Sequence, residues 1–229
     1  MKNPWDELAR EQRRKGRWRV RLAAAGTLVA GVGLVGALGA ALTGLSASNQ
    51  FGNATPALVQ AEISALRREL DDARGRLALA EVRLEHGKAV AKYSEVYRVP
   101  ADLAEAIYDI ALAEGLHPSL GFQLVKVESR FQPDARSERG AIGYTQLRLK
   151  TARGYDSTIT ERDLLDRDTN LRVGFRFLKD LIARFDQDVH LALVAYNRGP
   201  TRVEEMMTRG ENPANGYAEI VLKGVKKGS

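Results

Sequence analysis

The chain has 229 residues, 44% of them hydrophobic and 28% charged, which is typical of a folded protein of one or two domains. It contains no cysteine, so disulfides, cysteine metal ligands and a cysteine nucleophile are excluded. The net charge of +6 is concentrated in residues 1–21, whose eight basic and three acidic side chains account for +5, and this local excess argues against a nucleic-acid partner.

The first predicted element is residues 22–45, a stretch of 24 residues without a charge. As a helix it would be about 36 Å long, enough to cross the roughly 30 Å hydrocarbon core of a membrane. Because basic residues precede it, residues 1–21 are expected to form a cytoplasmic tail and the remainder to be exported. The alternative is a cleaved signal peptide, because the small residues Ser46 and Ser48 could form a cleavage site. The apolar region of a signal peptide is only about 7–15 residues long, however, which is shorter than this stretch. We therefore expect a retained transmembrane helix.

After a polar linker over residues 46–57, apolar residues are spaced alternately by four and three positions, as in a coiled-coil seam. The seam residues are Val59, Ile63, Leu66, Leu70, Ala73, Leu77, Ala80 and Leu84. Flanking residues that would face each other in a parallel dimer, such as Glu62 and Arg67, are opposite in charge. The pattern predicts a coiled-coil stalk over residues 58–92 and a parallel homodimer through residues 59–84. The alternative is one amphipathic helix packed on its own domain.

Residues 93–225 are predicted to form a mainly α domain. A helix should follow Pro100 and end near Gly115, and the turn at residues 117–119 should start the helix that carries Glu128. Residues 130–143 resemble a loop, because they are rich in polar and turn-forming side chains. Further helices are expected over residues 169–185, 189–196, 201–209 and near 217–222.

Several kinds of functional site lack their usual signature. The histidines, His86, His117 and His190, are scattered and have no second ligand at metal-binding spacing, so no metal site is expected. The sequence has no glycine-rich phosphate loop and no Gly-x-Ser-x-Gly nucleophile. No cofactor is therefore expected.

Glu128 is the remaining candidate. It follows an apolar run near the end of its helix, so desolvation and the negative end of the helix dipole should both raise its pKa. A carboxyl that stays protonated near neutral pH can donate its proton to a leaving oxygen. From this stretch alone, the simpler interpretation is a surface glutamate paired with Lys126 or Arg130.

Three blocks decide between these interpretations. They are ESRFQPDARSERGAIGYTQLR at residues 128–148, NLRVGFRFL at 170–178 and LALVAYNRGPTRV at 191–203. Together, in this order, they resemble the signature of the soluble lytic transglycosylase (SLT) family, whose members have a lysozyme-like fold. The resemblance covers about residues 93–222. It implies a lysozyme-like catalytic domain that follows the transmembrane and coiled-coil helices in the chain.

The resemblance also implies roles for individual residues. Glu128 matches the single catalytic acid/base of the family. Ser129 and Gln146 match residues that line the sugar groove, Tyr196 matches the tyrosine beside the glutamate, and Asn197 matches the asparagine after it. Two positions depart from the family pattern: Tyr-Thr stands at residues 144–145 in place of Leu-Met, and Arg replaces the Ala that follows the asparagine.

The activity that the resemblance implies is cleavage of the β-1,4 bond between N-acetylmuramic acid (MurNAc) and N-acetylglucosamine (GlcNAc) in peptidoglycan, with formation of 1,6-anhydro-MurNAc. Two alternatives stay open. If Asp134, Glu138 or Asp156 poised a water, the enzyme would be a hydrolytic muramidase. If the domain only bound glycan, the chain would be a membrane scaffold. The expected location is the bacterial inner membrane, single-pass, with the catalytic domain in the periplasm.

Overall fold

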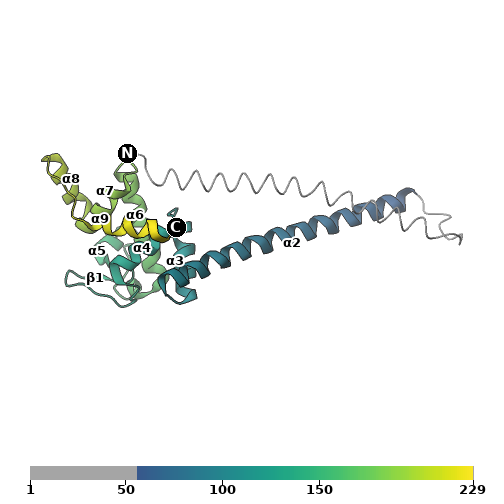
Figure 1. The fold of residues 1–229 in the computed structure, drawn as a ribbon, viewed down its shortest axis with the longest axis horizontal. Helices are drawn as coiled ribbons and strands as arrows, with labels where there is room; N and C mark the ends of the chain where they lie inside the picture. The colour runs from purple at the N-terminus through teal and green to yellow at the C-terminus, as the bar shows by residue number, and fades with distance from the viewer. Residues whose placement is uncertain (1–55, 229) are drawn as a thin grey trace. The chain divides into compact units, whose positions relative to one another are not determined.

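The computed structural model describes residues 56–228 (Figure 1). The expected cytoplasmic tail, the transmembrane helix and nearly all of the linker lie outside these residues. None of the helices in the described part is long and apolar enough to cross a membrane. The chain divides between Asp72 and Ala73 into two units.

Helix α2, Pro56–Tyr97, is a single helix of 42 residues. The prediction that the stalk is helical is therefore confirmed. The helix also continues without a break through residues 85–88. The large side chains of the seam are exposed over its length: Ile63, Leu66, Leu70, Leu77 and Leu84. Within the described residues, the seam is therefore left open to solvent, and its pairing with a second chain stays a prediction.

The last turns of α2 belong to the helical domain. Tyr93 stacks on Phe122 with ring centroids 4.4 Å apart, and Tyr97 stacks on the same ring at 4.9 Å. The hydroxyl of Tyr97 also accepts a 2.7 Å hydrogen bond from Gln123 Nε2. These aromatic side chains fix the C-terminal end of α2 in the core. The predicted boundary between stalk and domain, at residues 92 and 93, therefore lies inside α2 and not at a helix end.

Helices α3, Ala101–Ala113, and α4, Pro118–Ser129, lie where the sequence predicted them. His117 caps α4, since its Nδ1 accepts a hydrogen bond from the Ser119 amide at 3.3 Å. Burial lowers the pKa of this imidazole. Arg130, in a left-handed conformation with φ of 53°, ends the helix. The apolar face of α4 packs against α3 and α9 (Figure 1).

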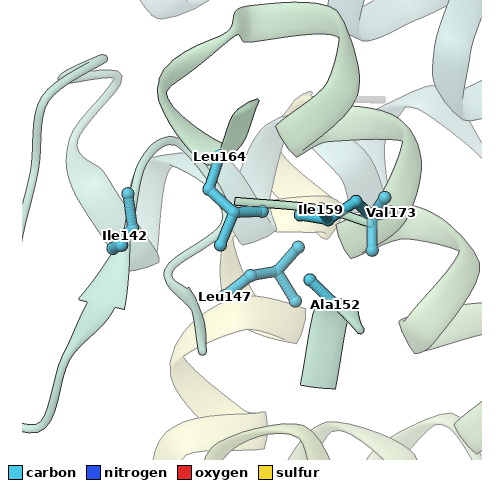
Figure 2. Close-up of a cluster of buried hydrophobic side chains, with 6 residues drawn as sticks. All are labelled: Ile142, Leu147, Ala152, Ile159, Leu164 and Val173. Atoms are coloured by element: carbon cyan, nitrogen blue, oxygen red, sulfur yellow. The ribbon is translucent and has the colours of Figure 1, made fainter. Parts of the chain in front are cut away.

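The segment after α4 is more ordered than the expected loop. It contains an antiparallel hairpin of β1, Ala141–Ile142, and β2, Leu147–Arg148, and then α5, Leu149–Ala152, and the 3-10 helix η1, Asp163–Leu165. Figure 2 shows the buried cluster beside this hairpin, formed by Ile142, Leu147, Ala152, Ile159, Leu164 and Val173. Strands of two residues are too short to produce the alternation that would predict them.

Four helices complete the domain: α6, Arg167–Arg184; α7, Val189–Arg198; α8, Pro200–Thr208; and α9, Tyr217–Gly228. Helix α7 packs against α6, α8 and α9 (Figure 1). The fully buried apolar side chains of residues 192–195 put α7 at the centre of the core. The predicted mainly α class is confirmed.

Candidate active site

Glu128 lies in the last turn of α4, where its side chain is partly buried. The hydroxyl of Tyr217, the first residue of α9, donates a hydrogen bond to its Oε1. Among the described residues, Glu128 forms no ion pair. Lys126 lies instead 5.7 Å from the ring centroid of Tyr97, and Arg130 is exposed at the end of the helix. The simpler interpretation of a surface ion pair is therefore wrong.

Burial raises the pKa of Glu128 from 4.5 to about 7, and the hydrogen bond from Tyr217 opposes this rise because it stabilises the carboxylate. The pKa of the Tyr217 phenol is raised well above its usual range, by burial and then by the charge of Glu128. Tyr217 therefore keeps its proton and acts as a donor. Near neutral pH, Glu128 is present in both protonation states, which suits a group that must first give and then take a proton.

A cleft of about 360 Å³ opens beside Glu128. Its walls come from the loop before β1, the hairpin, α5, one residue of α6, the end of α7 and the start of α8. Gln146, Tyr196 and Asn197 line it together with Glu128, so the structure brings four of the five expected site residues to one place. Among the described residues that line the cleft, Glu128 is the only carboxylate.

Ser129, the fifth expected residue, is 6% exposed and is absent from the lining of this cleft. Its hydroxyl donates a 3.1 Å hydrogen bond to the Val125 carbonyl, one turn earlier in α4. In the structure, Ser129 thus bonds to its own helix, and its role in lining the sugar groove stays a prediction.

Tyr196 links the helix core to the hairpin. Its hydroxyl donates a 2.8 Å hydrogen bond to the carbonyl of Thr145. Thr145 is in turn held by Asn170, whose Oδ1 accepts from the Thr145 amide and hydroxyl, each at 2.8 Å. The Asn170 amide nitrogen donates to the carbonyls of Ile142 and Leu164 at 2.9 and 2.8 Å. This buried network fixes the hairpin turn, and with it the cleft wall, against α6.

Gln146 has a left-handed backbone with φ of 50°. Its side-chain nitrogen donates to the carbonyls of Ala135 and Gly143, both at 3.0 Å, so the side chain is held across the hairpin turn. Gly143 has φ of 78° and lies against Asn170, where a β-carbon would collide with the asparagine side chain. The glycine therefore lets the turn approach α6 closely enough to orient Gln146 into the cleft.

The pKa of Tyr196 is raised well above its usual range, by burial and then by the negative charge of Glu128. The interaction agrees with the expected position of this tyrosine beside the glutamate. Asn197 is exposed, and its Oδ1 accepts a 2.8 Å hydrogen bond from Asn215. Tyr196 therefore contributes an aromatic ring to the cleft wall, and Asn197 forms its solvent edge.

Tyr217 is the functional residue that the sequence did not reveal. It is 89 positions from Glu128, and nothing local to either residue indicates that they meet. The only signal is an aromatic residue at the start of the last predicted helix. The packing of α4 against α9 creates the contact.

The three candidates for a second carboxylate lie elsewhere. Asp134 and Glu138 are exposed, and neither lines the cleft. Asp156 is exposed and accepts hydrogen bonds from the amide and hydroxyl of Thr158, which lower its pKa. The described part of the structure therefore brings none of them to Glu128.

Two helices together supply a group of possible metal ligands that the sequence did not predict. The ligand atoms of His86, Glu105 and Asp109 lie within 4.8 Å of one another. His86 Nε2 lies 2.6 Å from Asp109 Oδ1, so an ordinary hydrogen bond accounts for the contact. Because the histidine lies on α2 and the acids on α3, their spacing along the chain gave no metal signature.

Comparison with known families gives the site its context. The family model "Transglycosylase SLT domain" matches residues 105–216, which include Glu128, the cleft and α7. Residues 105–216, just under half of the chain, are therefore similar to the transglycosylase SLT family. Glu128, in helix α4, lies within the matched residues.

A curated relative, the peptidoglycan transglycosylase gp16 of Escherichia phage T7, is 31% identical over 108 residues, which are 46% of this chain and 8% of the phage protein. Among solved structures, lytic transglycosylase Slt from Pseudomonas aeruginosa is 28% identical with a TM-score of 0.49, covering 54% of this chain and 23% of that one. The 70 kDa soluble lytic transglycosylase of Escherichia coli is 22% identical with a TM-score of 0.48, covering 57% and 24%. The chain spans less than a quarter of the length of each of these proteins.

Proposed function

We propose that this protein is a peptidoglycan lytic transglycosylase that cleaves the β-1,4 bond between MurNAc and GlcNAc and forms 1,6-anhydro-MurNAc. The match to the SLT family model and the name of the phage relative support the substrate class. The observation that carries the proposal is a single carboxyl group in the cleft, partly buried and with a pKa of about 7.

In the proposed reaction, protonated Glu128 gives its proton to the glycosidic oxygen as the bond from that oxygen to muramyl C1 breaks. GlcNAc leaves with a new hydroxyl. The resulting carboxylate then takes the proton of the muramyl C6 hydroxyl, and O6 bonds to C1. Glu128 returns to its protonated form, and no water is consumed. The Tyr217 hydroxyl bonds to Glu128 Oε1 and would hold the carboxyl in place through both steps.

The surroundings of Glu128 favour this route over hydrolysis. Glycosidases usually use two carboxyl groups, the second as nucleophile or as the base that activates water. Among the described residues, no second carboxylate lines this cleft. An internal hydroxyl as nucleophile removes the need for one, because the substrate itself carries the attacking oxygen.

Mass spectrometry of the products from purified cell walls tests the proposal. Products with 1,6-anhydro-muramyl ends support it, whereas reducing muramyl ends would make the protein a muramidase and the absence of cleavage would leave a glycan-binding module. Glu128→Gln should bind glycan and lose nearly all turnover, because an amide neither donates nor accepts the required proton. Glu138→Gln is the matched control, since this nearby glutamate is exposed and outside the cleft.

We further propose that the protein is anchored in the bacterial inner membrane with the SLT domain in the periplasm. The charge-free residues 22–45 behind a basic tail support the anchor. A helical stalk over residues 59–84 would be about 39 Å long. Its exposed seam supports a parallel homodimer, because large apolar side chains at heptad spacing become buried when two such helices pair.

A further inference from the structure

The cleft beside Glu128 has a positively charged wall. Arg139 in the loop before β1, Arg148 in β2 and Arg198 at the end of α7 all line it. Arg139 and Arg148 are exposed, and Arg198 is partly buried. Apart from Glu128, no acidic side chain among the described residues lines the cleft. The three arginines therefore line a cavity that has almost no negative charge of its own.

None of these three arginines forms an ion pair within the described residues. Other arginines of the domain do so: Arg136 with Glu161, Arg167 with Asp102, Arg176 with Glu114, Arg184 with Glu204 and Arg209 with Glu211. An arginine that faces a cleft without a carboxylate partner can bind an anionic ligand without first breaking an internal pair.

Arg198 carries a further sign of an absent partner. Its Nε is buried and has no hydrogen-bond acceptor in the described structure, and its Nη1 has only a 4.0 Å contact with Met206 Sδ. A buried donor without an acceptor is unfavourable, so a ligand carboxylate that draws the guanidinium into the cleft would relieve this defect. The residue directly follows Asn197 at the cleft's solvent edge, at the position where the SLT resemblance has alanine.

The chemistry of the proposed substrate supplies such an anion. MurNAc differs from GlcNAc by a lactyl group at C3, which ends in a free carboxylate in bare glycan and continues into a peptide with carboxylates of its own in the intact wall. A guanidinium group binds a carboxylate through two parallel hydrogen bonds, and this geometry distinguishes an acid from a neutral amide.

We propose that Arg198, assisted by Arg139 and Arg148, binds a carboxylate of the lactyl-peptide substituent and thereby makes the cleft selective for anionic muramyl glycan. The identity of the glycan rests on the proposed function, whereas the preference for a carboxylate rests on the three arginines. Arg198 is thus a specificity residue of this chain that the family pattern does not supply.

Binding to the full chain carrying Glu128→Gln tests the proposal, because this change prevents cleavage during the measurement. Four tetrasaccharide probes are compared. Three are GlcNAc–MurNAc repeats, whose lactyl groups are free acids in the first, neutral methylamides in the second and linked to peptides in the third. The fourth is a neutral GlcNAc tetramer. Arg198→Ala should weaken binding of at least one carboxylate-bearing probe by about tenfold, as for a charge-assisted hydrogen bond. Binding of the methylamide and neutral probes should change by less than about twofold.

The pattern of losses identifies the source of the carboxylate. A loss with the free lactyl acid assigns the lactyl group, and a loss with the peptide-bearing probe alone assigns the peptide. Equal losses on the acid and the methylamide, or no loss on any probe, would overturn the proposal. Arg148→Ala should give a smaller loss of the same selectivity, and because this residue is exposed the change should not impair folding. Arg202→Ala is the matched control, since this exposed arginine of α8 is outside the cleft.

Turnover on cell walls separates this inference from the proposed function. With active protein, Arg198→Ala should raise KM on peptidoglycan with a smaller effect on kcat, and added salt should reduce the difference from wild type. If wild type fails to cleave walls but the probes show an arginine-dependent preference for the acid, the carboxylate site stands and the transglycosylase proposal fails. If walls are cleaved and the arginine-dependent preference is absent, the transglycosylase proposal stands and the carboxylate site fails.

Discussion

Glu128→Gln is expected to stabilise the folded protein at alkaline pH while abolishing turnover. The folded pKa of Glu128 is raised from 4.5 to about 7, chiefly by burial. A carboxyl with a raised folded pKa contributes its full stability below the unfolded pKa, and this contribution is lost as pH rises through the folded pKa. Wild type should therefore lose stability between about pH 4.5 and 7, and remain lower above that range.

The shift sets the size of the effect. About 2.5 pKa units at 1.36 kcal/mol each correspond to about 3 kcal/mol as an upper bound. Because part of the side chain remains in contact with water, which screens the charge, we expect about 1–2 kcal/mol at about pH 8. Glutamine has the same shape and its carbonyl can still accept from Tyr217, so the substitution removes the charge with little change in packing.

Equilibrium urea unfolding of wild type and variant at several pH values measures the difference. Near-UV circular dichroism is a suitable signal, since all seven tyrosines lie within residues 93–217. Glu95→Gln is the control, because this glutamate of α2 is exposed. If the advantage of Glu128→Gln is the same at acid and alkaline pH, then burial of the charged carboxylate does not set the pKa and the reasoning is refuted.

Three further outcomes are expected. Tyr217→Phe removes a hydrogen bond that stabilises the carboxylate, so the pKa of Glu128 should rise further. The alkaline limb of the plot of kcat/KM against pH should therefore move up by about one pH unit. An unchanged limb would contradict the contact between Tyr217 and Glu128. Changing Leu70 and Leu77 to Lys should convert the expected dimer to monomer in analytical ultracentrifugation, because like charges would meet in the seam, and a wild type that is monomeric at high concentration would remove the stalk dimer. A reporter fused after Ser229 should be active only in the periplasm, and the chain should resist carbonate extraction from membranes; release by carbonate would argue against the anchor.

The sequence by itself determined the helical class of the domain and the place of its acid. Helix boundaries follow from local signals, such as Pro100 before α3 and the cap at His117, and these act within a few residues. The position of Glu128 after an apolar run also predicted a raised pKa, since burial on a helix face can be read from spacing. The blocks around Glu128, Gln146 and Tyr196 supplied the family.

The tertiary structure alone decided which side chains meet Glu128. The Tyr217 hydroxyl reaches it because α9 packs on α4, and the hairpin that holds Gln146 is fixed by Asn170 from α6. The unpartnered Nε of Arg198 is likewise a property of packing, because it depends on which acceptors the neighbouring elements leave within reach. Local patterns specify how a segment folds and which face it buries, whereas contacts between distant segments depend on how those faces pack together, and no spacing along the chain encodes that directly.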